Sequence, residues 1–186
     1  MTTAVLPPEE QVILVDPENR PIGRLEKLRA HQEALLHRAF SVFVFDGRGR
    51  VLLQRRALGK YHSGGRWSNT CCGHPRPGED TASAAVRRLG EEMGFTCRLE
   101  QRFDFSYRAR VGHGLMEHEH DTVFVGRYDG PLAPDPDEVA EWRHVSVPGL
   151  LSELRRAPNR FTVWLRIILN SRFPDLLLAS REQALP

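Results

Sequence analysis

Arg88 and Glu92 are the pair of residues whose spacing says most about chemistry in this sequence. They are four residues apart, so on a helix they lie one turn apart on the same face. Two glutamates at these positions would converge on one divalent cation, an oxygen-rich arrangement that suits Mg²⁺ bound to a diphosphate. Arg88 instead predicts an ion pair with Glu92, which taken alone could be an ordinary solvated salt bridge. This helix has therefore lost part of its capacity to hold a metal cluster that hydrolyses a diphosphate.

A second group of metal-binding residue types lies outside this helix. Glu117 and Glu119 sit where a strand is expected to begin, and alternate residues of a strand share a face. Their carboxylates, about 7 Å apart along the strand, could meet one cation if imidazoles complete its ligand set. Such a mixture of nitrogen and oxygen ligands suits Zn²⁺ or Mn²⁺ and also admits Mg²⁺. The candidate imidazoles are those of His31, His37 and His74.

The spacing of these histidines does not decide whether they bind a metal. His31 and His37 are six residues apart, which is not a chelating spacing on a helix, so they must come from two different local segments. On spacing alone, either one could equally be an exposed or a core histidine. The remaining histidines considered are expected on solvated polar faces or in loops, and they are His62, His113, His118 and His120.

The element that positions Arg88 and Glu92 can be predicted from its apolar pattern. Apolar residues recur at three- and four-residue spacing from Thr81 to Met93, which predicts an amphipathic helix. Asp80 or Thr81 can cap the start of this helix, and Gly94 can end it. Its predicted buried face consists of Ala82, Ala85, Val86, Leu89 and Met93.

The other predicted elements alternate between strands and helices. Strands are expected at 12–15, 98–110, 119–128 and 142–147, and a hairpin at 40–54 with its turn at 46–49. Residues 23–39 are charged and predicted to be partly helical, residues 57–69 form a loop, and 150–156 and 161–170 are predicted helices separated by Pro158. Strands with helices between and after them predict an α/β sandwich.

Length and composition set broad limits on the protein. A chain of 186 residues is expected to be a single domain, and a net charge of +2 gives no case for nucleic acid binding. The N-terminus lacks a basic stretch followed by an apolar run, and no segment approaches membrane-spanning length. We therefore expect a soluble, cytoplasmic protein without a membrane partner, as a monomer or weak dimer. Its three cysteines, two of them adjacent, are expected to be free thiols.

Two motifs together make a resemblance to a known family specific. The segment 73–95 matches the Nudix box, G-x5-E-x7-R-E-U-x-E-E-x-G-U, except that Arg88 stands where a glutamate is expected. Cys72 directly precedes the first glycine of the box and gives the sequence Cys-Gly-His-Pro. From about residue 10 to 170, the chain resembles type I isopentenyl-diphosphate isomerases. The motifs that carry this resemblance, in order, are Leu25-Glu26-Lys27, His31, His37, Arg55-Arg56-Ala-Leu-Gly-Lys60, Trp67-Ser-Asn-Thr-Cys-Cys72-Gly-His74-Pro75, the modified box, Tyr107-Arg-Ala, Glu117-x-Glu119 and Trp164.

The resemblance implies a fold and a set of ligands. The fold is a Nudix-type α/β/α sandwich with a mixed β-sheet, with its core at about 36–168, a segment at 10–37 that supplies metal ligands and C-terminal helices at 150–180. One divalent metal, Mn²⁺, Zn²⁺ or Mg²⁺, is implied to be ligated by His31, His37, His74, Glu117 and Glu119. Glu92 is implied to help hold a second metal, Mg²⁺, which bridges to the substrate diphosphate.

The implied reaction moves a double bond within a five-carbon prenyl diphosphate. It adds a proton at one end of an alkene and removes a proton at the other, in a site that is closed to water. By resemblance, Glu119 handles the alkene end and Cys72 the C2 proton, with roles that reverse with the direction of reaction. The Tyr107 hydroxyl can hydrogen-bond the Glu119 carboxyl group. Trp164 can stabilise the carbocation through the face of its ring, although as a residue it could simply belong to the core.

The remaining candidates concern the diphosphate and the choice of thiol. Arg56, Lys60, Arg88 and Lys27 are the candidate diphosphate ligands, since Arg binds phosphate bidentately and Lys acts as a point charge. Surface charge is the alternative for each of them, and for Lys27 the two interpretations are equally good. Cys71 is expected to be a buried small apolar residue rather than the catalytic thiol.

Two other functions remain open from the sequence. A Nudix diphosphohydrolase is the first alternative, because Glu79, Arg87, Glu91 and Glu92 of the box are retained. The second is a binding module with the same fold and no catalytic activity.

Overall fold

The structure is a computed structural model that describes residues 11–172. The strands of this part of the chain form one sheet. They are β1 (Gln11–Val15), β2 (Pro21–Glu26), β3 (His37–Phe45), β4 (Arg50–Arg56), β5 (Trp67–Ser68), β6 (Cys71–Gly73), β7 (Leu99–Gly112), β8 (Leu115–Arg127) and β9 (Val139–Ser146). The helices are α1 (Lys27–Gln32), α2 (Thr81–Met93), α3 (Val147–Arg156) and α4 (Val163–Ser171), with a 3₁₀ helix at Pro158–Arg160.

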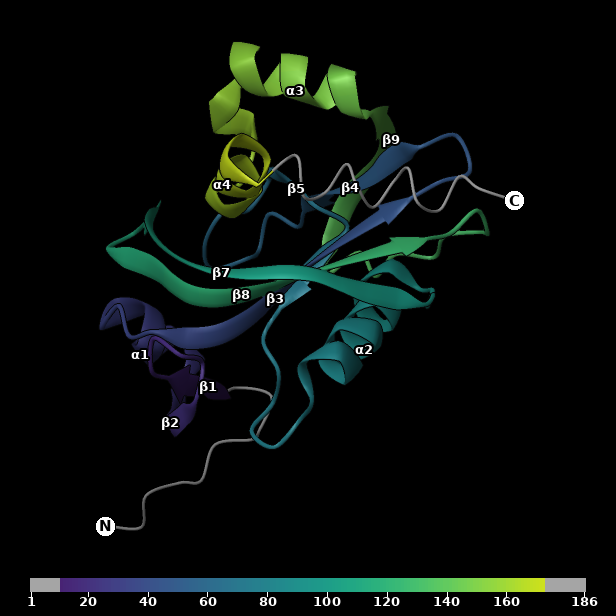
Figure 1. Cartoon of the computed structure of the whole chain (residues 1–186). Coiled ribbons are helices and arrows are strands. Elements are labelled where there is room, and N and C mark those ends of the chain that lie inside the picture. Colours follow the sequence, from purple (N-terminus) through teal and green to yellow (C-terminus); the bar gives the residue numbers. More distant parts are fainter. Residues whose placement is uncertain (1–10, 173–186) are drawn as a thin grey trace.

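Helices cover both faces of this sheet, so the described chain has three layers (Figure 1). The two faces of β3 explain the arrangement, since alternate side chains of a strand point in opposite directions. Phe40, Val42 and Val44 pack with the apolar side of α2, whereas Phe43 and Phe45 pack in the core formed with α3 and α4. The predicted α/β/α sandwich is confirmed, and the parallel pairing of β3 with β8 among antiparallel neighbours makes the sheet mixed.

Strand β3 is the centre of the sheet and positions most of the site. One of its edges pairs with β8 along its whole length, from His37↔Glu119 to Phe45↔Arg127. Its antiparallel partners change along the strand and are β1 at His37, β6 between Phe40 and Val42, and β4 at Phe45. Segments that are far apart in the sequence, including 71–73 and 115–127, therefore meet at the first half of β3.

The expected hairpin at 40–54 is only partly correct. Its turn is present, but β3 and β4 share a single pair, Phe45↔Val51, and then diverge to pair with other strands. The hydroxyl of Thr70 lies between them, since it accepts a hydrogen bond from the Val44 N–H at 2.8 Å and donates one to the Leu52 carbonyl at 2.7 Å. A buried side chain thus replaces the missing ladder between the two strands.

Helix α2 has the bounds that its apolar pattern predicts. Asp80 caps it by accepting a hydrogen bond from the Ser83 N–H at 2.9 Å, and Gly94 ends it with φ of 73°. A Cβ at Gly94 would lie 2.2 Å from the Ala133 carbonyl oxygen, so glycine is required there for space as well as for conformation. Ala82 was predicted to be buried but is exposed, because the helix face that packs against the sheet includes Ala84 instead.

Other predicted elements differ from the structure at their ends or were missed. The strand predicted at 119–128 begins earlier, at Leu115, so that Glu117 and Glu119 lie inside it rather than at its start. Strand β2 and the short strands β5 and β6 lie in segments dominated by turn-forming or loop-like residues, which concealed them. Residues 173–180 of the predicted C-terminal helices lie outside the described residues.

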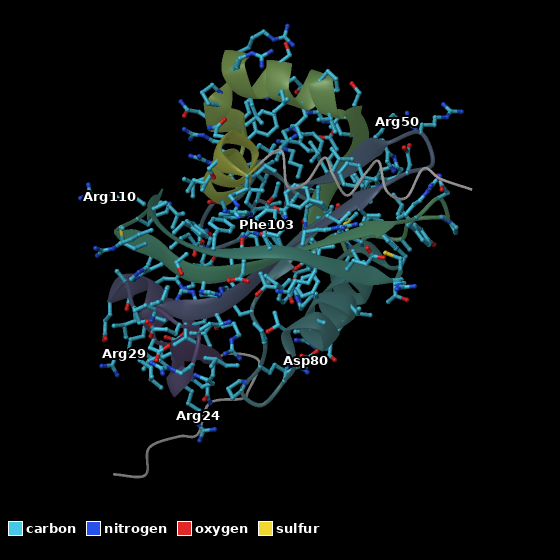
Figure 2. All side chains as sticks on the ribbon, viewed as in Figure 1. Arg24, Arg29, Arg50, Asp80, Phe103 and Arg110 are labelled. Carbon is cyan, nitrogen blue, oxygen red and sulfur yellow. The ribbon has the colours of Figure 1, made fainter. Side chains whose placement is uncertain are left out.

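Side chains follow these layers. In Figure 2, Phe103 of β7 points into the space between the sheet and the helices α3 and α4, where it is 8% exposed. Arg24, Arg29 and Arg110 instead project away from the chain into solvent. No helix among residues 11–172 is long and apolar enough to cross a membrane.

Candidate active site

Two histidines near the N-terminus are oriented by hydrogen bonds to backbone carbonyl oxygens. His31 lies on the short helix α1, which Glu26 caps by accepting hydrogen bonds from the N–H groups of Leu28 and Arg29. Its Nδ1 lies 2.7 Å from the Lys27 carbonyl oxygen, and Nδ1 of His37 lies 2.8 Å from that of Leu35. Each ring therefore uses Nδ1 for the backbone and leaves Nε2 available for another partner.

Strands β7 and β8 supply the carboxylates and a tyrosine. Glu117 and Glu119 point to the same side of β8, as their spacing predicts. Tyr107 lies directly opposite Glu119 on β7 and donates a hydrogen bond to its Oε2 at 2.5 Å. On the other oxygen, Oε1, Glu119 has His74 Nε2 at 2.9 Å and His37 Nε2 at 3.6 Å. The β3–β8 pairing thus brings His37 next to Glu119. His74, which follows β6, and His31 of α1 add ligand candidates from two further segments.

The buried polar atoms at this junction fit a metal ion. The ligand atoms of His31, His37, His74 and Glu119 all lie within 4.8 Å of one another. Nε2 of His31 and Oε2 of Glu117 are 3.0 Å apart, yet neither has a hydrogen-bond partner among the described residues, and the same holds for Nε2 of His37. Buried polar groups are rarely left unpaired. Their lone pairs converge on a common space, which is the arrangement that a cation would complete.

The protonation states of these groups suit metal binding. Burial lowers the pKa of His31, and it lowers the pKa of His74 to about 3, so both rings are neutral and offer a lone pair. Burial and the nearby Glu119 charge raise the pKa of Glu117 well above its usual range. Burial also acts on Glu119, but the adjacent imidazoles of His37 and His74 outweigh it and hold its pKa well below the usual range. The pKa values of the two carboxyl groups are thus shifted in opposite directions, and Glu117 is the one whose protonated form is favoured.

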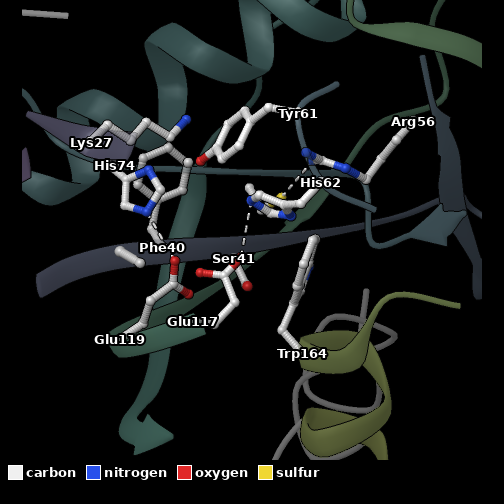
Figure 3. Close-up of a pocket in the computed structure, with 13 residues that line it drawn as sticks. Lys27, Phe40, Ser41, Arg56, Tyr61, His62, His74, Glu117, Glu119 and Trp164 are labelled. Atoms are coloured by element: carbon white, nitrogen blue, oxygen red, sulfur yellow. Dashed lines mark hydrogen bonds and ion pairs between the residues drawn. The ribbon is translucent and has the colours of Figure 1, made fainter. Parts of the chain in front are cut away.

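Cys72 and Glu119 line the same cavity. Cys72 lies on β6, opposite Ser41 of β3. Trp164 of α4 also lines the cavity (Figure 3). Burial raises the pKa of the Cys72 thiol to about 12, so the thiol is protonated at neutral pH. The guanidinium of Arg56 lies close to this thiol, with Nη1 at 3.8 Å from Sγ. A thiol with a proton and a carboxylate without one thus share a single cavity.

Trp164 belongs both to the core and to this cavity. It is 4% exposed and packs in the core formed with α3 and α4, which is one of the two interpretations of its sequence context. Its indole Nε1 donates hydrogen bonds to Ser68 Oγ at 3.0 Å and to Asn69 Oδ1 at 3.1 Å. These bonds fix the ring beside the cavity, where Arg56 lies 5.4 Å from its centroid.

A second, positively charged cavity of about 270 Å³ adjoins the first. The four predicted diphosphate ligands, Lys27, Arg56, Lys60 and Arg88, all line it, together with Glu92. Lys27 lies against the ring of Tyr61, with Nζ at 5.3 Å from the centroid, and burial lowers its pKa. Lys27 thus lines a cavity, which favours the ligand interpretation over that of surface charge.

The predicted ion pair of Arg88 with Glu92 is confirmed. Arg88 Nη2 lies 2.5 Å from Glu92 Oε1, and the same nitrogen lies 3.2 Å from Oε1 of Glu138. Glu138 also pairs with Lys60, so one carboxylate from the segment before β9 contacts two cations of the cavity. Gln54 donates to the other oxygen of Glu92 at 2.8 Å. The pair is partly buried in a network rather than solvated.

Comparisons with known proteins agree with this geometry. The chain matches the NUDIX domain over residues 35–165. It is 59% identical over 161 residues to the isopentenyl-diphosphate Delta-isomerase of Burkholderia multivorans, across 87% of this chain and 92% of that protein. It is 52% identical over 162 residues to isopentenyl-diphosphate Delta-isomerase 2 of Aromatoleum aromaticum, across 87% and 86% of the two chains. The chain belongs to the isopentenyl-diphosphate Delta-isomerase family.

A solved structure supports the fold of this isomerase-family chain but says nothing about its reaction. A protein from Deinococcus radiodurans superposes with a TM-score of 0.67 at 16% identity, across 80% of this chain and 90% of that chain. Such a likeness at low identity shows the fold alone. The predicted Nudix fold and the predicted family are thus both confirmed.

The structure corrects the expectation for two histidines of this isomerase-family chain. His62 was expected in a solvated loop, but it is 6% exposed, and its Nε2 lies 3.3 Å from Glu117 Oε1. Burial lowers the pKa of His62 to about 2. His120, also expected to be solvated, is 7% exposed and lies between β7 side chains, with Nε2 at 3.1 Å from Asp104. Both histidines lie in polar segments whose sequence predicts exposure, but other parts of the fold cover them.

Three further residues of the site were not anticipated. They are Glu138 in the positively charged cavity, Gln54 beside Glu92, and Asp121, whose buried carboxyl group accepts a hydrogen bond from Ser41 at 2.8 Å. Asp121 continues the alternating series of Glu117 and Glu119, which is a signal that the sequence does contain. Cys71 is fully buried in the core with α2, as expected.

Proposed function

We propose that this chain interconverts isopentenyl diphosphate and dimethylallyl diphosphate, with a divalent cation in the cluster of histidines and glutamates. The observation that carries the proposal is that Cys72 and Glu119 line one cavity. This cavity adjoins a second one lined by lysines and arginines, which supplies charges of the sign that a diphosphate needs. Membership of the isomerase family supports the same reaction.

The reaction balances as a pair of proton transfers. From isopentenyl diphosphate, one proton adds to C4 of the alkene, a tertiary carbocation forms at C3, and one proton leaves C2. No oxidant, reductant or water is consumed. An unactivated alkene is a very weak base, so the reaction needs a positioned acid and a site that excludes water from the cation.

We assign Glu119 to C4 and Cys72 to C2. A protonated thiol and an ionised carboxylate are the state that reacts with dimethylallyl diphosphate. In that direction Cys72 protonates C2, and Glu119 takes a proton from C4. The opposite protonation state starts from isopentenyl diphosphate. The Tyr107 hydroxyl holds the Glu119 carboxyl group in place, and the ring of Trp164 stabilises the carbocation through its electron-rich face.

The positively charged cavity accounts for diphosphate binding. Arg56 and Arg88 offer paired N–H donors, and Lys27 and Lys60 offer ammonium groups. Glu92 provides a carboxylate at the same cavity that would help to hold Mg²⁺, which would offset the negative charge of the diphosphate. Because a cation, Arg88, occupies the position at which a second chelating carboxylate would sit, the site favours holding the diphosphate intact.

The donor set of the buried cluster constrains its metal. His31, His37, His74, Glu117 and Glu119 combine three imidazoles with two carboxylates, which suits Zn²⁺ or Mn²⁺ and also admits Mg²⁺. When bound, this cation supplies a local positive charge that shifts the pKa values of the neighbouring acid and base.

The decisive experiment follows deuterium from heavy water into isopentenyl diphosphate. We expect uptake with the wild-type protein and its loss in Cys72→Ala and Glu119→Gln. Cys97→Ala is the control and should retain uptake, because Cys97 is a free thiol outside the cavity. Uptake that persists in Cys72→Ala and disappears in Cys71→Ala would show that the neighbouring thiol is the reactive one. Release of phosphate without any deuterium uptake would instead establish a hydrolase.

A further inference from the structure

His62 places an imidazole next to the cluster of histidines and glutamates, and no motif of the sequence predicts this. It lies in the segment between β4 and β5, yet its ring is buried between Tyr61 and Trp164, with ring centroids at 4.4 Å and 6.0 Å. Figure 3 shows the ring pointing into the cavity toward Glu117. These contacts hold the imidazole at the boundary between the cluster and the cavity that contains Cys72.

The carboxylate of Glu117 lies between two imidazoles. Its Oε2 is 3.0 Å from His31 Nε2, and its Oε1 is 3.3 Å from His62 Nε2. Ligands bound at about 2.0–2.2 Å from one metal ion are themselves separated by roughly 3 Å when they are adjacent in the coordination shell. The ligand atoms of His31, His62 and Glu117 all lie within 4.8 Å of one another. The three side chains therefore have the spacing of a ligand set.

This set and the group formed by His31, His37, His74 and Glu119 have one member in common, His31. A neutral imidazole has one N–H and one lone pair, and Nδ1 of His31 is directed at the Lys27 carbonyl oxygen. Only the Nε2 lone pair remains, so His31 can bind one cation at a time. Two cations cannot share His31, so the two groups can supply ligands to only one cation there.

We propose that Nε2 of His62 is a further ligand of the divalent cation bound by His31 and Glu117. This inference rests on the proposed metal dependence of the chain. His62 would hold this cation from the segment that lies beside Trp164. The competing role for His62 is that of a hydrogen-bond donor to Glu117 without contact to the metal.

The test uses Co²⁺ as the probe and the full-length protein stripped of metal, without substrate. Co²⁺ affinity and visible absorption are measured for wild type, His62→Ala, His62→Gln and His144→Ala. His144 lies on β9, outside the residues of either metal group, and controls for loss of a histidine. Glutamine keeps an N–H donor that can reach Glu117 but is a poor metal ligand. Thermal unfolding of each metal-free protein confirms that it is folded.

We expect both His62 variants to bind Co²⁺ more than about tenfold more weakly than wild type and to change its absorption, because the coordination shell loses a nitrogen. His144→Ala should match wild type. Wild-type affinity and absorption in His62→Gln would overturn the proposal and show that His62 acts as a hydrogen-bond donor. Unchanged binding in His62→Ala would also overturn it and show that His62 only lines the cavity. Failure of the wild-type protein to bind Co²⁺ would instead refute the cation centre itself, and the role of His62 with it.

Discussion

The hydrogen bond from Tyr107 to Glu119 allows a quantitative test of the proposed role of Glu119 in proton transfer. The Tyr107 hydroxyl donates to Oε2 at 2.5 Å in a buried environment. A hydrogen bond to a charged group contributes about 1.5–3 kcal/mol. A factor of ten in rate corresponds to about 1.4 kcal/mol, so losing this bond should lower kcat/KM by about 10- to 150-fold. Tyr107→Phe removes only the hydroxyl and retains the ring, which stacks on Phe105 with centroids 5.6 Å apart.

The assay is the rate of deuterium uptake from heavy water into isopentenyl diphosphate, measured across pH. The donor stabilises the ionised form of Glu119, so its removal should raise the pKa of that carboxyl group and move the acidic limb of the profile to higher pH. Tyr128→Phe is the matched control, because its hydroxyl donates to the Pro131 carbonyl outside the cavity. A folded Tyr107→Phe protein with kcat/KM and pH profile indistinguishable from wild type would refute the assignment of Glu119 as a reacting group held by this bond.

Three further predictions concern stability and substrate binding. Thr70→Val leaves the two backbone groups that its hydroxyl bridges without partners, at about 1–3 kcal/mol each, so urea unfolding should show a loss of about 2–6 kcal/mol, whereas Thr96→Val at an exposed position should show almost none. Leu89→Ala empties a fully buried position of α2 and should lower the free energy of unfolding by about 2–5 kcal/mol; a change below this range would mean that the helix repacks. Arg88→Gln removes a proposed diphosphate ligand and leaves Glu92 without its cation, so KM should rise more than kcat falls; an unchanged KM would contradict the proposed role of Arg88.

Helix α2 could be predicted because all of its determinants are local. The apolar spacing, the cap at Asp80 and the left-handed residue at Gly94 lie within 15 residues, and each has the predicted role. The pairing of β3 with β4 was predicted from equally local evidence, namely a turn between two apolar runs, and was largely wrong. The partners that take the place of β4 along this edge of β3 are residues 71–73 of β6 and Leu14 of β1, and a local pattern carries no information about such distant competitors. A turn predicts where the chain reverses, but not how far the two strands remain paired.

The same distinction explains the site. The residue types for metal and diphosphate binding could be identified from the sequence, but their distances depend on the register of β3 with β8, and the grouping rested on resemblance to a family. Glu138 and His62 belong to no motif of that resemblance, and their polar neighbours indicate exposed loops. His62 is buried and Glu138 half-buried, and each faces charges from another segment: Glu138 contacts Arg88 and Lys60, and His62 contacts Glu117. Polar loop residues that the fold covers are therefore where this structure adds most to the sequence, because burying them requires partners that only the tertiary arrangement provides.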